Sequence, residues 1–237
     1  YLDLDQVNDT PQERAHLIAS MVALPPARDE AVSRYLATNH PHKPSKAPTL
    51  VPGSTNIVID EWITPTLGQR TRDPIEAPDG AIWWTGMWAS LVGRLDPDTG
   101  KMTEFPLPSS ARPHSIVPDD EGFIWYTGNS NGTIGRLNPA DGSIKEFPTQ
   151  ARDPHTAVFH PNGSLYFTSQ HSNMLGRLNP KTGDLIEVDT RRKPYGIKVG
   201  KDGDLFVAFN GTNAIGRMDP QTLSLSYYDI PDEATRI

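Results

Sequence analysis

The chain has 237 residues, of which 36% are hydrophobic, and a formal net charge of −7. No stretch approaches the roughly 18 apolar residues that would suggest a membrane span. The acidic balance argues against general nucleic-acid binding, which usually needs a basic face. Cysteine is absent, which excludes disulfides, thiolate metal sites and a cysteine nucleophile.

Residues 1–50 differ in kind from the rest of the chain. Thr10-Pro11-Gln12-Glu13 is a capping box with proline at the first helical position, and it predicts a short helix that ends at Pro25-Pro26. A second helix is predicted from about Ala27 to Ala37, followed by a proline-rich linker. We therefore divide the chain into a helical N-terminal extension with its linker at 1–50 and a second domain at 51–237.

The second domain is a repeat with a period of about 40 residues. A Gly-Arg dipeptide recurs in it, and each arginine lies 14 residues after a turn glycine. The dipeptides are Gly93-Arg94, Gly135-Arg136, Gly176-Arg177 and Gly216-Arg217, and the turn glycines are Gly80, Gly122, Gly163 and Gly203. An aromatic residue, expected to be buried, stands three residues after each turn glycine, namely Trp83, Trp125, Tyr166 and Phe206.

Each repeat is predicted to contain four short strands. In the second repeat a first strand begins near residue 114, and runs at 123–127, 133–138 and 143–147 are separated by turns typical of antiparallel hairpins. Four short strands per repeat, without a helical period, predict an all-β fold, the β-propeller. The four complete blades cover about 71–110, 111–150, 151–190 and 191–231.

A lone strand is predicted at Asn56–Trp62, before the first blade. Such a strand normally closes the ring by pairing with the last three strands of the chain, and residues 232–237 have the look of a fifth repeat that is cut off. We expect a chain truncated at its C-terminus, part of a six- or seven-bladed ring that would need about 80 to 120 more residues.

The repeats carry Gly-x-Ile-Trp-Trp-Thr from Gly80, Gly-x-Ile-Trp-Tyr-Thr from Gly122 and Gly-x-Leu-Tyr-Phe-Thr from Gly163, each followed by Gly-Arg-Leu-(Asp/Asn)-Pro. Over about residues 56–231 this pattern resembles the virginiamycin B lyase (streptogramin B lyase) family. The resemblance implies a seven-bladed propeller, an Mg2+-dependent elimination that opens a cyclic depsipeptide antibiotic at its ester, and so a part in antibiotic resistance. Residues 31–39 resemble the closing helix of a c-type cytochrome domain, which suggests a cytochrome-like partner domain and a periplasmic or secreted location.

The position eight residues before each turn glycine varies among polar residues, while other positions of the repeat keep one type. Its occupants are Arg72, His114, His155 and Tyr195, at the start of the innermost strand of each blade. Histidine suits acid–base work near neutral pH, so His114 and His155 are the catalytic candidates. Arg72 and Tyr195 are predicted to bind a ligand. The alternative is that both histidines only bond backbone groups or ordered water.

The loops between the second and third strands are predicted to add further ligand-binding residues, which are Trp88, Asn129, Gln170, His171 and Asn210. Aromatic and amide side chains suit a flat, amide-rich ligand such as a cyclic peptide in the central channel. The alternative is that they are ordinary turn residues. Basic residues at the blade entrances either form a positive rim or, more simply, pair with acidic neighbours such as Asp73 and Asp153.

No Mg2+ ligands can be identified. Six residues after the turn glycine, where a glutamate could bind the metal, the chain has Gly86, Gly128, Ser169 and Phe209. The two histidines could share a metal if their rings converge. We expect a metal-dependent carbon–oxygen lyase that opens a cyclic ester or depsipeptide. The alternative is a non-catalytic propeller that binds a partner protein or small ligand, and a six-bladed lactonase is a weaker third interpretation.

Overall fold

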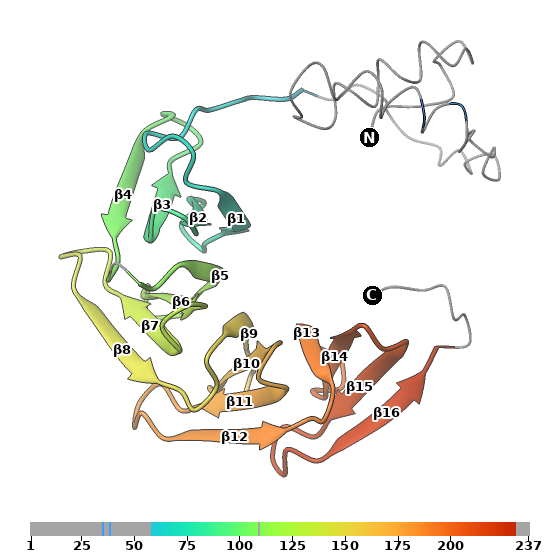
Figure 1. Cartoon of the computed structure of the whole chain (residues 1–237). Coiled ribbons are helices and arrows are strands. Elements are labelled where there is room, and N and C mark those ends of the chain that lie inside the picture. The colour runs from blue at the N-terminus through green and yellow to red at the C-terminus, as the bar shows by residue number, and fades with distance from the viewer. Residues whose placement is uncertain (1–34, 36–37, 39–57, 109, 231–237) are drawn as a thin grey trace. The chain divides into compact units, whose positions relative to one another are not determined.

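The computed structural model describes residues 35, 38, 58–108 and 110–230 (Figure 1). The chain divides between Asp60 and Glu61 into two units. Tyr35 and Thr38 are helical, and no helix among the described residues is long and apolar enough to cross a membrane. The predicted helix start, the linker and the segment at 232–237 lie outside the described residues, and of the cytochrome-like segment only Tyr35 and Thr38 are described.

The described residues form sixteen strands in four antiparallel sheets, each with its four strands in chain order. The first sheet contains β1 (Thr71–Glu76), β2 (Ile82–Gly86), β3 (Leu91–Leu95) and β4 (Met102–Pro106). The second contains β5 (Pro113–Pro118), β6 (Ile124–Gly128), β7 (Thr133–Leu137) and β8 (Ile144–Pro148). The third contains β9 (Pro154–Phe159), β10 (Leu165–Ser169), β11 (Met174–Leu178) and β12 (Leu185–Asp189). The fourth contains β13 (Lys193–Val199), β14 (Leu205–Asn210), β15 (Ala214–Met218) and β16 (Leu225–Asp229).

The sheets stand side by side, with their first strands β1, β5, β9 and β13 as neighbours on the inner side (Figure 1). The fourth strands lie on the outer side. This is how propeller blades are arranged, and it confirms the predicted fold. The predicted lone strand is the exception, since residues 58–62 form no strand. They are exposed, and no described strand offers them the backbone hydrogen bonds that a strand needs.

Hydrophobic residues of neighbouring blades pack together and fill the space between them. Trp83 on β2, for example, belongs to one buried cluster with Ile116 and Tyr126 of the second blade. The aromatic position is buried in three blades, at Trp83, Trp125 and Tyr166, as predicted. In the fourth blade its occupant is different: Phe206 is 41% exposed.

The glycine of each Gly-Arg step is required by the ring beside it. Gly135 on β7 pairs with Tyr126 on β6, and a Cβ atom at Gly135 would lie 1.9 Å from the Tyr126 Cζ atom. Gly93 and Gly176 face the rings of Trp84 and Phe167 in the same way, at 2.0 Å. Because no side chain fits at such distances, the repeated glycine follows from packing inside each blade.

Candidate functional site

The four variable polar residues lie in one row along the inner strands. Arg72 Nη1 lies 2.7 Å from His114 Nε2. The His114 and His155 rings are 3.7 Å apart at their centroids with planes 35° apart, and the His155 and Tyr195 rings are 4.4 Å apart. Residues separated by about 40 positions in the sequence therefore touch one after another, and we call Arg72, His114, His155 and Tyr195 the polar row.

Buried threonines on the second strands fix the backbone of this row. Thr85 donates to the carbonyl oxygen of His114 at 3.0 Å, although His114 belongs to the next blade. Thr127 donates in the same way to His155 at 2.9 Å, and Thr168 donates to Tyr195 at 2.7 Å. A hydroxyl of the preceding blade thus holds the backbone of three row residues, His114, His155 and Tyr195, which keeps neighbouring members of the row in register.

The first strands are also irregular at the row. The pairing of β1 with β2 shifts register between Arg72 and Ile75, and the other three inner pairs shift at corresponding places. Bulges of this kind bend a strand and re-aim its side chains. The row residues are therefore presented from bulged ends of the inner strands rather than from regular pairing.

One ring nitrogen of His114 is occupied and the other faces a carboxylate. The Arg72 guanidinium can only donate hydrogen bonds, so Nε2 of His114 accepts and a neutral ring carries its proton on Nδ1. That Nδ1 is buried, lacks a hydrogen bond among the described residues and lies 3.5 Å from Asp73 Oδ2. His114 is thus held between a cation and an anion, with its lone pair engaged by Arg72.

The ring of His155 is buried and electrically neutral at neutral pH. Burial lowers the pKa of His155 from 6.5 to about 4, and the electrostatic interactions with His114 and Arg72 act in the same direction, while the carboxylates of Asp73 and Asp153 act in the opposite direction. Its Nδ1 lies 2.9 Å from the Thr156 hydroxyl. No described residue hydrogen-bonds its Nε2, so this nitrogen is available to an incoming group.

The loop residues divide into anchored and open ones. The Asn129 side chain donates to the Pro154 carbonyl oxygen at 3.0 Å, which ties the second blade to the third. Trp88 is 65% exposed, and the Arg70 guanidinium lies 5.3 Å from its ring centroid. Gln170 and Asn210 are half-buried and His171 is exposed. Trp88 therefore offers the largest open aromatic surface among the predicted loop residues.

Two aspartates contribute to the site in a way that sequence reasoning missed. The sequence favours a pairing of these aspartates with basic residues at the blade entrances, but Asp73 faces His114, and Asp153 accepts from the backbone of His171 and Ser172. Asp73 directly follows a row residue and Asp153 stands two positions before one. Their closeness in sequence to row residues is the signal that could have identified them, although the two positions are not equivalent in the repeat.

The described residues do not fit an Mg2+ ion. They contain no group of three or more histidine, aspartate or glutamate side chains placed to hold a metal. The two histidine rings lie against each other with their planes tilted by 35°, and a guanidinium already occupies Nε2 of His114. The half-buried carboxylate of Glu146 instead accepts hydrogen bonds from Tyr126, Asn131 and Thr133.

Comparison with known proteins gives a consistent result. Residues 58–237 match the model of the virginiamycin B lyase family. A streptogramin B lyase structure is 33% identical with a TM-score of 0.69, and the match covers 75% of this chain and 60% of that one. Virginiamycin B lyase from Staphylococcus aureus is 28% identical with a TM-score of 0.69, covering 74% of this chain and 61% of that one.

A third structure adds a bound ligand. It is a catalytically inactive histidine-to-alanine variant of the Staphylococcus aureus enzyme with quinupristin, 27% identical with a TM-score of 0.68, covering 73% of this chain and 60% of that one. No curated protein matches the chain. The chain spans about three fifths of the length of these three structures. With the family model matched over 58–237 and the same fold, the chain belongs to the virginiamycin B lyase family.

Proposed function

We propose that this protein is a carbon–oxygen lyase that opens a cyclic ester or depsipeptide held over the polar row. Membership of the family supports the reaction class. The observation that carries the proposal is His155, a neutral and buried imidazole whose Nε2 has no hydrogen-bond partner among the described residues, placed between a second histidine and a tyrosine.

In the proposed elimination, His155 takes a proton from the carbon next to a carbonyl group. The electron pair of that C–H bond forms a C=C bond, the neighbouring C–O bond breaks, and the ester carboxylate leaves without the entry of water. A pKa of about 4 keeps His155 in its base form at neutral pH but makes it a weak base. Stabilisation of the developing negative charge by the nearby Arg72 cation must therefore contribute much of the acceleration.

The resemblance implies Mg2+, which would stabilise the same negative charge when bound. Because the described residues do not provide a site for it, we assign no step to a metal. Trp88, Gln170, Tyr195 and Asn210 offer aromatic and amide surface for a cyclic peptide, which is the ligand class we propose. A periplasmic or secreted location and a cytochrome-like partner domain are proposed only from the resemblance of residues 31–39.

A non-catalytic binding propeller is the second candidate. It is favoured by the contact between Arg72 and His114, which engages the lone pair that His114, one of the two candidate bases, would need. In this case the polar row would hold a ligand by hydrogen bonds and stacking, with no bond broken. The two candidates share a ligand class, so they are separated by product analysis rather than by binding.

The test uses the full chain and quinupristin, with added Mg2+ or with EDTA, and liquid chromatography with mass spectrometry. Elimination gives a ring-opened product of unchanged mass, whereas hydrolysis adds one water. His155→Gln should lower the rate by about 100-fold or more, since that is the usual contribution of a general base. His160→Gln, at the other end of the blades, is the control. Binding without conversion would favour the binding propeller. If quinupristin is neither bound nor converted, both candidates are refuted.

A further inference from the structure

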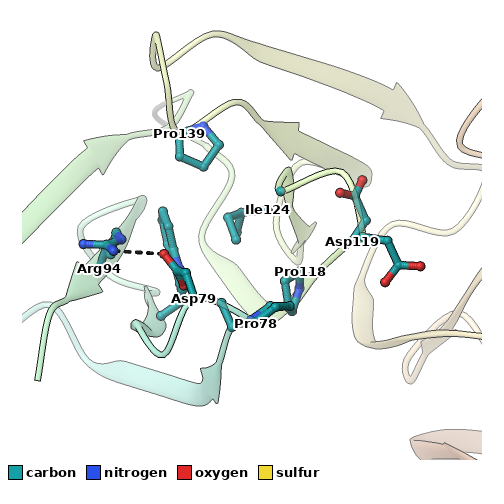
Figure 2. Close-up of a pocket in the computed structure, with 11 residues that line it drawn as sticks. Pro78, Asp79, Arg94, Pro118, Asp119, Ile124 and Pro139 are labelled. Carbon is teal, nitrogen blue, oxygen red and sulfur yellow. Dashed lines mark hydrogen bonds and ion pairs between the residues drawn. The ribbon is translucent and has the colours of Figure 1, made fainter.

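A pocket lies between the first and second blades, at the end opposite the polar row. The row begins β1 and β5, whereas the pocket is lined by residues that follow or close these strands, including Pro78 and Pro118 (Figure 2). Trp83, Ile124 and Pro139 complete an apolar wall. The volume is about 240 Å³. This is room for a small ring compound, remote from the proposed reaction.

One lining residue of the pocket, Ala77, is smaller than its counterparts in the second and third blades. Ala77, Asp119 and His160 occupy the same turn position, since the carbonyl of each accepts a bond from the turn glycine three residues later. Asp119 uses its side chain to accept a bond from Trp125 Nε1 at 2.7 Å. His160 reaches the Gly203 carbonyl oxygen of the next blade at 2.6 Å. The methyl side chain of Ala77 can make neither bond.

Trp83 is left with an unused donor in this pocket. It is the counterpart of Trp125 in the repeat, but the position of Asp119 is held by Ala77 in the first blade. Trp83 is only 2% exposed, and its indole N–H has no acceptor among the described residues. This nitrogen is not among the fully buried side-chain atoms that lack a partner in the described residues, so water reaches it, and an acceptor supplied by a ligand in the pocket would take the place of that water.

The pocket also has an excess of negative charge. Arg94 and Asp79 pair at 3.0 Å on one side (Figure 2). On the other side Asp119 and Asp120 have no ion-pair partner among the described residues. Asp119 accepts only from neutral N–H groups. Two unbalanced carboxylates beside an apolar wall attract a positively charged ligand.

We propose that this pocket binds a small aromatic or alicyclic cation that carries a hydrogen-bond acceptor on its ring. The ring lies against the prolines and Ile124, the acceptor takes the N–H of Trp83, and the positive charge lies toward Asp119 and Asp120. The proposal is independent of the polar row and of the lyase reaction, since none of its residues belongs to the row.

The test is a titration of the full chain with three probes. Calorimetry measures the binding, and the indole N–H signals in NMR report which tryptophan is affected. Tyramine has the ring, the acceptor and the charge, phenethylamine lacks the acceptor, and 4-hydroxyphenylacetate reverses the charge. Tyramine should bind, shift the Trp83 signal, and bind about three- to tenfold more tightly than phenethylamine, as expected for one hydrogen bond. The anion should not bind.

Two variants make the test specific. Ala77→Asp should fill the pocket, satisfy Trp83 as Asp119 satisfies Trp125, and abolish tyramine binding. Trp83→Phe keeps the ring but removes the donor, so it should bind tyramine and phenethylamine equally, a result that does not depend on Ala77→Asp folding. The proposal is overturned if tyramine binding does not saturate, or if 4-hydroxyphenylacetate binds as tightly as tyramine. It is also overturned if Trp83→Phe still binds tyramine more tightly than phenethylamine.

Discussion

Acid should destabilise this protein through His155, and the size of the effect can be calculated. Burial and the electrostatic interactions with His114 and Arg72 hold its pKa near 4 in the folded chain, against 6.5 for an unperturbed histidine. The folded chain therefore binds the proton less tightly than the unfolded chain. The contribution of His155 to stability is present above pH 6.5 and is lost as the pH falls through 6.5 toward 4.

The magnitude follows from these two pKa values. Between pH 7 and pH 5 the free energy of unfolding should fall by about 2 kcal/mol because of this one side chain. Below pH 4, where both states are protonated, the loss levels off at about 3 kcal/mol. The tilted ring contact of His155 with His114, with centroids 3.7 Å apart, is the contact that protonation would disturb first.

The assay is urea unfolding at a series of pH values for the unmodified chain and for His155→Gln. Every other titrating group is common to both, so subtracting the two curves isolates His155. The unmodified chain should lose about 2 kcal/mol more than the variant between pH 7 and pH 5. Parallel curves, or an NMR titration of His155 with a midpoint near 6.5, would refute the electrostatic description of the polar row.

Two further predictions concern the scaffold. Gly135→Ala should lower the free energy of unfolding by about 3 kcal/mol in thermal unfolding, because its methyl group would overlap the Tyr126 ring. Gly196→Ala is the control, since its methyl group would meet nothing within 4 Å, and it should change this free energy by less than about 0.5 kcal/mol. Thr127→Val should lower the free energy of unfolding by about 1 to 3 kcal/mol in urea unfolding, because it removes the hydrogen bond to His155. Thr127→Ser keeps the hydroxyl and should retain most of this free energy. If it does not, the hydroxyl is not what joins the blades.

The sequence predicted the blades well because the repeat aligns equivalent positions. The strands expected at 123–127, 133–138 and 143–147 are found at Ile124–Gly128, Thr133–Leu137 and Ile144–Pro148. The alternation and turn chemistry that define these hairpins are local in sequence. The strand expected at 56–62 shows the limit, since a strand also needs a partner, and residues 58–62 have none among the described strands.

The polar row was predictable as a set but not as a chemical arrangement. Its variation inside a strict repeat identified Arg72, His114, His155 and Tyr195, and neighbouring inner strands then bring them together. The contact of Arg72 with Nε2 of His114 depends on side-chain conformations that the sequence does not encode locally. The position of Asp73 depends on a backbone with φ of 41°, which a repeat comparison does not reveal.

The threonine hydroxyls that join the blades have a consequence for how such a site can change over evolution. They bond to the backbone carbonyls of His114, His155 and Tyr195, and every amino acid supplies the same carbonyl. A substitution in the row therefore exchanges the chemistry without removing the bond that holds the position. The scaffold separates what must be kept from what is free to diversify, so one arrangement of blades can be fitted to new ligands one side chain at a time.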